Sequence, residues 1–158
     1  MIQKLEQQIK QLQAAVNQII RQGIVTSVYP DRGTVRVKLP DSGGIVSKEL
    51  AVLFQKTQDN KDYDMPDIGE QVVCLFLPNG MEQGYVIGSP YSTVDKVPVT
   101  DADKKHYSFK DETWFEYDRK THKFKVFIKG TIDIHADGKI TIDSGEHIQL
   151  TAPRIDIN

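Results

Sequence analysis

The sequence has few of the features that mark secreted, metal-cluster or membrane proteins. Cys74 is its single cysteine, so the chain forms neither an internal disulfide nor a cysteine-cluster metal site. No apolar run approaches the roughly 18–20 residues that span a bilayer, and the polar stretch that begins the sequence is not typical of a secretory signal. We therefore expect a protein that is made and folded in a cytoplasm, with Cys74 buried in the apolar stretch QVVCLFL.

The sequence also has little excess of either sign of charge and few catalytic motifs. The formal net charge is −2, which gives no overall field toward nucleic acid or an anionic membrane. The sequence contains no glycine-rich phosphate loop, nucleophile elbow or HExxH motif. A group of carboxylates clusters in one short stretch, but aromatic residues are interleaved with it and no cleft is indicated. These carboxylates are Asp111, Glu112, Glu116 and Asp118. We therefore predict that the protein is not an enzyme and needs no cofactor.

Residues 1–22 are predicted to form a helix that ends at Gly23. Its apolar residues recur at steps of 3, 4, 3, 4 and 3, which places them on the single stripe of a coiled coil. The stripe consists of Ile2, Leu5, Ile9, Leu12, Val16 and Ile19. The helix could pack on its own domain or mediate self-association, and the narrow stripe between polar faces favours self-association. Such a short coil associates weakly alone, and Ile or Val at position a with mostly Leu at d leans toward dimers.

Residues 23–90 are predicted to fold as a small barrel of the OB type. Several short runs have the composition of strands: Val25–Tyr29, Thr34–Leu39, 49–54, 71–77 and 84–90. A Pro-Asp-Arg-Gly turn joins the first two runs, and a hairpin loop containing Asn79 and Gly80 joins the last two. The polar stretch 55–70 is expected to be the most mobile loop.

Residues 91–110 are predicted to be a polar connector, and residues 111–158 a hairpin followed by a repetitive tail. The hairpin is expected to pair Trp114–Tyr117 with Lys123–Ile128. In the tail, pairs of apolar residues follow one another at steps of 8, 8 and 7 residues. The pairs are Ile132 and Ile134, Ile140 and Ile142, Ile148 and Leu150, and Ile155 and Ile157. In strands of period 2 each pair faces one side, and a single chain offers nothing to cover it.

Two architectures could bury these pairs. A single chain could wind into a solenoid, but about three turns of seven or eight residues enclose too small a core. Three identical chains wound around one axis would instead cover each other's pairs and leave Asp, Lys and Thr in water. We favour this intertwined trimeric β-helix, in which the helix first brings the chains together. Its predicted core consists of Phe124, Val126, Ile128, Ile132, Ile134, Ile140, Ile142, Ile148, Leu150, Ile155 and Ile157.

Three stretches resemble the phage baseplate assembly protein V family, the central spike of contractile-tailed phages and tail-like bacteriocins. GIVTSVYPDRGTVRVKLP is similar to the family's first barrel hairpin. MPDIGEQVVCLFLPNGMEQGYVIGSPYS is similar to its signature Pro-x-x-Gly-Glu-x-Val followed by Gly-Tyr-Val-Ile-Gly. WFEYDRKTHKFKVFIKGTIDIHADGKITI is similar to the hairpin that leads into the family's triple-stranded β-helix. Together these stretches cover most of residues 23–158.

The resemblance implies a mainly β homotrimer with a short N-terminal helix and an OB-fold collar attached to the tail tube, hub and baseplate. It also implies a β-helical needle that the contracting sheath pushes against the host's outer envelope. The protein would then belong to the tail baseplate of a virion or tail-like particle that is assembled in the bacterial host cytoplasm. A separate small protein is expected to cap the tip, because the final residues RIDIN show no closing fold.

Some spikes of this family hold an iron ion between His-x-His motifs of three chains, but this sequence contains no such motif. His135 and His147 are the two histidines of the tail. They alternate with Ile134 and Ile148 and are expected to face outward. We therefore predict no metal site.

An OB-fold module that binds nucleic acid is the alternative function. Single-strand binders need a basic groove interleaved with aromatic residues. The barrel offers only Arg32, Arg36, Lys38 and Lys48 with Tyr29 and Phe54, and Asp59, Asp62, Asp64 and Asp67 lie on the long loop. We expect these charges to form a solvated face and predict no binding of nucleic acid.

Overall fold

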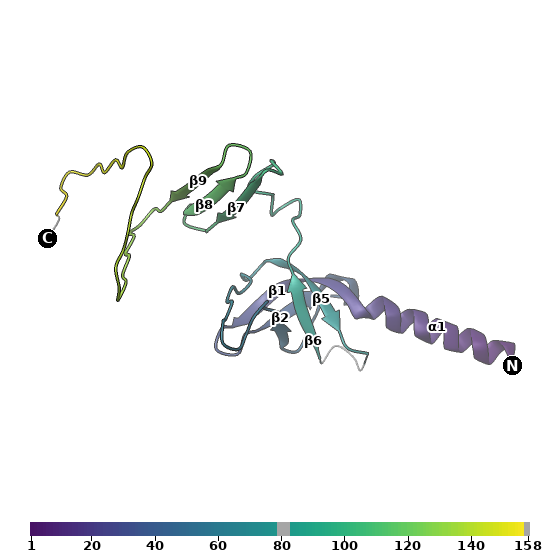
Figure 1. Ribbon diagram of the computed structural model, residues 1–158. Helices are drawn as coiled ribbons and strands as arrows, with labels where there is room; N and C mark the ends of the chain where they lie inside the picture. Colours follow the sequence, from purple (N-terminus) through teal and green to yellow (C-terminus); the bar gives the residue numbers. More distant parts are fainter. Residues whose placement is uncertain (79–82, 157–158) are drawn as a thin grey trace. The chain divides into compact units, whose positions relative to one another are not determined.

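The computed structural model describes residues 1–78 and 83–156 (Figure 1). The chain divides into two compact units, Met1–Val97 and Pro98–Asn158. Asn79 and Gly80 of the predicted hairpin loop lie outside the described residues, as does Ile157 of the predicted trimer core. In the described part of the chain, no helix is both long and apolar enough to cross a membrane.

Helix α1, Ile2–Ile19, continues directly into strand β1, Ile20–Tyr29 (Figure 1). The backbone is already extended at Ile20, and Gly23 pairs with Val72 inside the sheet. The prediction that Gly23 ends the helix is therefore wrong, and no linker separates the helix from the barrel.

Gly23 has a different structural role, which is to let two strands approach closely. A Cβ atom at this position would lie 2.2 Å from Val37 Cγ1 and 2.8 Å from the backbone oxygen of Lys38. Both neighbours belong to strand β2, Thr34–Leu39. Because either distance is shorter than van der Waals contact, any larger residue would push β2 away from β1.

The first unit contains a closed barrel. Its sheet has the order β1-β5-β6-β4-β2-β3, and an additional pairing between β1 and β2 closes it. The remaining strands are β3 (Ile45–Val46), β4 (Leu50–Val52), β5 (Gln71–Phe76) and β6 (Gly84–Gly88), and a short 3-10 helix, Pro40–Ser42, follows β2. Strands β4 and β6 pair in parallel. The predicted strands and the OB-like barrel are confirmed, whereas the short β3 was not predicted.

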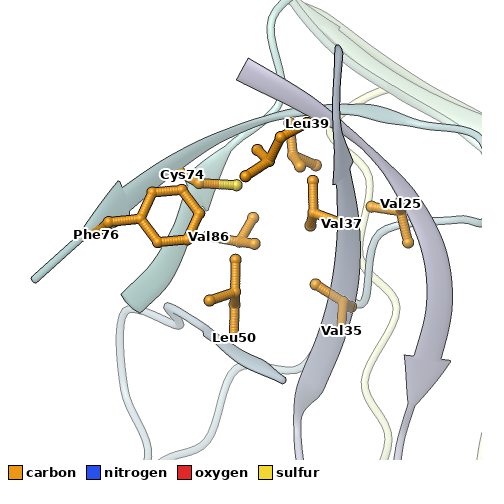
Figure 2. Packing of buried hydrophobic residues seen from close by; sticks show 9 residues of the cluster. Val25, Val35, Val37, Leu39, Leu50, Cys74, Phe76 and Val86 are labelled. Atoms are coloured by element: carbon orange, nitrogen blue, oxygen red, sulfur yellow. The ribbon is translucent and has the colours of Figure 1, made fainter. Parts of the chain in front are cut away.

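Alternate residues of these strands point into the barrel and form its core (Figure 2). The core consists of Val25, Val35, Val37, Leu39, Leu50, Val72, Cys74, Phe76 and Val86. The prediction that Cys74 is a buried core residue is confirmed, and burial raises the pKa of its thiol to about 11. Cys74 therefore stays protonated and unreactive at neutral pH.

Arg21, at the start of β1, is buried beside the core residue Phe76. The Arg21 guanidinium donates from Nε to Asp41 Oδ2 over 3.0 Å, and its Cζ atom lies 5.9 Å from the centre of the Phe76 ring. The hydrogen bond from Arg21 holds the pKa of the Asp41 carboxyl below the usual value of an aspartate. The pair therefore ties the 3-10 helix to the point where α1 enters the barrel.

The second unit contains a three-stranded antiparallel sheet with the order β7-β8-β9. Strands β8 (Trp114–Asp118) and β9 (Lys123–Phe127) confirm the predicted hairpin. Strand β7, Lys104–Ser108, was not predicted, and residues 91–110 are therefore not a connector throughout. After β9, residues 128–156 form no strand within the chain (Figure 1).

Candidate assembly surfaces

The apolar stripe of α1 is exposed along its length. None of the helix is buried in the described part of the chain, and the side chains of Ile2, Leu5, Ile9, Leu12 and Val16 are 46% to 74% exposed. Ile19, the last member of the predicted stripe, is half-buried where the helix meets the barrel. The predicted stripe thus lies on one helix, and over residues 2–16 no other helix or strand described in the first unit packs against it.

One face of the β7–β9 sheet is largely apolar, with Lys105 Nζ 5.8 Å from the centre of the Tyr107 ring as its charged member. The strand pairing sets Tyr107 opposite Phe115 and Phe115 opposite Val126, and it sets Tyr117 opposite Phe124. The rings of Tyr107 and Phe115 stack with their centres 4.8 Å apart. Phe124 and Val126, two residues of the predicted trimer core, lie on this face and are largely exposed. Phe124 and Val126 therefore share one face of the sheet.

The opposite face of the sheet carries an ion-pair cluster around Glu116. Lys104 Nζ lies 3.0 Å from Glu116 Oε1, and His106 Nδ1 lies 3.1 Å from Glu116 Oε2. The His106 ring stacks on Trp114, with 5.8 Å between the ring centres. The hydrogen bond from Lys104, followed by that from His106, holds the pKa of Glu116 below its ordinary value of 4.5.

Because this pKa is depressed in the folded sheet, Glu116 should contribute stability above its unfolded pKa and lose it as the pH falls through the folded one. We expect the difference in urea midpoint between the parent chain and Glu116→Gln to be larger at pH 7 than at pH 3. The fluorescence of Trp114, the single tryptophan, reports unfolding of this sheet. Lys104→Met, which removes the first donor, should shrink the same pH-dependent difference. An unchanged difference between the two pH values would contradict the role of the cluster.

The other acidic residues of the predicted cluster hold the turns of the sheet. Asp111 accepts hydrogen bonds from the Thr113 backbone N–H at 3.0 Å and from its hydroxyl at 2.9 Å. Glu112 pairs with Lys129, and Asp118 accepts from the backbone N–H groups of Lys120 and Thr121. Every carboxylate of the cluster thus has a structural partner, and no two of them share a site.

The repetitive tail exposes its apolar pairs. Of the predicted pairs, those with described side chains are between 49% and 76% exposed: Ile132, Ile134, Ile140, Ile142, Ile148, Leu150 and Ile155. Because residues 129–156 form no strands within one chain, their backbone N–H and C=O groups do not take part in the hydrogen bonds of a β-sheet. The tail therefore has both an apolar face and hydrogen-bonding groups that a single copy does not satisfy.

Each tail histidine has a contact with a residue close to it in sequence. His135 Nε2 is 3.6 Å from Asp137 Oδ1, and both side chains are fully exposed. The backbone oxygen of His147 accepts a hydrogen bond from the Ser144 hydroxyl at 3.1 Å. Over the described residues, no three His, Cys, Asp or Glu side chains gather as metal ligands would.

Three residues of the nucleic-acid alternative already have partners within the chain: Arg32, Tyr29 and Phe54. Arg32 stacks over Tyr29, 4.6 Å from the ring centre, and donates two hydrogen bonds of 3.1 Å to the Glu49 carboxylate. Phe54 stacks on Tyr63, with 5.9 Å between the ring centres. A base would have to displace these contacts, so the arrangement does not favour the nucleic-acid alternative.

A further apolar surface, which was not predicted from the sequence, lies on the outside of the barrel. Strand pairing sets Ile20 beside Leu75 and Leu75 beside Tyr85, and Tyr85 lies beside Ala51. These residues form an outward row across β1, β5, β6 and β4. The signal was the stretch QVVCLFL, in which apolar residues fill both faces of a strand.

The comparisons with known proteins agree with this architecture. Residues 21–91, which contain the barrel strands, match the family described as type VI secretion system/phage-baseplate injector OB domain. The chain is also similar to the spike protein of Escherichia phage P2, with 28% identity over 133 residues, or 84% of this chain and 62% of that protein. The chain thus spans less than two thirds of the length of this relative. The resemblance to phage baseplate spikes predicted from the sequence is confirmed.

Proposed function

We propose that this chain is a structural spike subunit in the baseplate of a contractile phage tail or a related particle. One observation carries the proposal: a barrel that matches the injector OB domain is followed in the same chain by a tail whose apolar pairs are exposed. The similarity to a phage spike protein over 84% of the chain supports the same reading. The protein acts mechanically in this proposal, without catalysis, cofactor, metal or nucleic acid.

In the proposed assembly, three copies wind their tails around one axis as a β-helix. Each isoleucine pair then packs against pairs from the other chains, at about 25 cal/mol for every Å² of apolar surface removed from water. The backbone groups of residues 129–156 pair between chains, which leaves no open strand edge along the shaft. Such a shaft is stiff and unfolds slowly.

The stiffness explains how a protein without a catalytic site could act on a cell envelope. The barrels form a collar that attaches to the tail tube, hub and baseplate, and the β-helical needle transmits the force of sheath contraction to the host's outer envelope. Contact with the envelope is transient. A separate small protein at the tip completes the needle.

The mass of the full chain in solution tests the trimer. Light scattering should give three times the 17.9 kDa of one chain, and the trimer should resist sodium dodecyl sulfate at room temperature. A form ending at Lys129 keeps the β7–β9 sheet intact and should dissociate when it is diluted. A monodisperse monomer of the full chain would overturn the proposal, because the isoleucine pairs would then have no cover.

A further inference from the structure

The outside of the barrel has two sectors of different chemistry. The row Ile20, Leu75, Tyr85 and Ala51 runs across β1, β5, β6 and β4, with Ile87 beside it on β6. We name these five residues the outer row. Alternation along each strand directs them away from the core, because their neighbours Cys74, Phe76 and Val86 point inward (Figure 2). On β2, by contrast, the outward positions are Thr34, Arg36 and Lys38.

The outer row is incompletely covered in a single chain. Ile20 is 63% exposed, Ile87 47% and Tyr85 37%, and Leu75 and Ala51 are half-buried. No member carries a charge. A contiguous apolar group of this kind on one side of a small barrel marks a surface that another molecule covers.

We propose that the outer row is the contact between barrels in the homotrimer, so that it faces the threefold axis. This inference rests on the proposed trimer and names the face of the barrel that the trimer uses. The molecule that covers the outer row is a second copy of the chain, because the direct connection between α1 and β1 brings the barrels of associated chains together.

The direct joint between α1 and β1 fixes where the barrels lie. Ile20, the first member of the outer row, directly follows Ile19, which is both the last residue of α1 and the last member of its apolar stripe. Since no linker intervenes, three helices that share an axis through their apolar stripes must carry Ile20 and the start of β1 to that axis. The faces of the barrels that continue from Ile20 are then the faces that meet.

The length of the helix points the same way. Helix α1 has 18 residues, about 27 Å at 1.5 Å per residue, which is too short for a strong coiled coil alone. If the coiled coil continues into the outer row, the contact between the helices is extended by a contact between the barrels. Contacts between three barrels would also favour a trimeric coiled coil, although the residues at positions a and d of the helix favour dimers.

Reactivity of a cysteine placed in the outer row tests the inference on the full chain. Ile87→Cys lies on β6, two strands from β1, so it reports the barrel face and not the helix. Arg36→Cys, on the outward side of β2, is the matched control, and the buried native Cys74 does not compete, because its pKa is about 11. We expect a maleimide to label Ile87→Cys at least tenfold more slowly than Arg36→Cys. A short bismaleimide should link copies of Ile87→Cys to one another and leave Arg36→Cys unlinked.

The outcomes separate this inference from the proposed function. Slow labelling with links between chains supports the outer row as the contact. A trimer in which Ile87→Cys labels as fast as the control overturns the contact and leaves the spike proposal in place. Slow labelling without links between chains also overturns it, because another part of the chain then covers the row. A monomer overturns both proposals.

Discussion

Replacing Ile134 and Ile142 together by Asp should convert the proposed trimer into a monomer. In the proposed β-helix these side chains face the shared axis, so the double variant would bury six carboxylates per trimer at two levels of the shaft. Each buried ion costs several kcal/mol even after relaxation. The combined cost exceeds the free energy that holds a typical folded domain together, about 5–15 kcal/mol. Light scattering should therefore give the mass of one chain, and resistance to sodium dodecyl sulfate should be lost.

The tail offers a matched control one residue away from each substitution. His135→Asp with Thr141→Asp adds the same number of carboxylates at the neighbouring positions, which alternate to the outward side. These carboxylates would remain in water, so the control should stay trimeric and keep its resistance to detergent. If both double variants dissociated equally, the loss would reflect added negative charge and not the inward face. If both stayed trimeric, the isoleucine pairs would not be the core of the assembly.

Leu39→Ala should weaken the barrel by about 2–5 kcal/mol. Leu39 is fully buried at the end of β2 and packs in the cluster with Val37 and Cys74 (Figure 2). Removing its branched end loses the transfer free energy of those atoms and leaves a cavity that a closed barrel cannot easily collapse. Hydrogen exchange of the β5 backbone amides, followed by mass spectrometry, measures the opening of the barrel alone. A loss of 2 kcal/mol corresponds to exchange that is roughly 30-fold faster.

The preceding residue supplies the control for this prediction. Lys38 lies on the same strand and points outward, where it is exposed. Lys38→Ala should therefore change the free energy of opening by less than about 0.5 kcal/mol, as is usual for surface sites. The two variants must be compared at equal protein concentration, because assembly adds to apparent stability. Equal effects of Leu39→Ala and Lys38→Ala would mean that β2 does not present alternate faces to the core and to solvent.

The strands of the barrel could be predicted because their side chains obey a simple period. In β2, Val35, Val37 and Leu39 are buried and alternate with exposed residues, so the strand and its inward face follow from the sequence. Strand β7 could not be predicted in this way. Four of its five residues are polar, and only Tyr107 is apolar. The strand exists because β8 provides a partner along its length.

Gly23 shows that a glycine in a sequence is compatible with two different structural roles. A glycine directly after an apolar helical stripe fits a helix end, and it fits equally a place where two strands approach closely. The position of Val37, fourteen residues further along the chain, decides between them. The outer row was missed for a similar reason, because its members come from four strands that are distant in sequence.

The absence of strands from residues 128–156 within one chain also bears on how such a protein can evolve. In the proposed shaft, each unit of seven or eight residues touches only the units above and below it. A duplication of one unit would lengthen the shaft without disturbing the barrel or the helix. Reach and attachment can then be selected separately, with the number of isoleucine pairs setting how far the needle extends and the barrel keeping its fit to the particle.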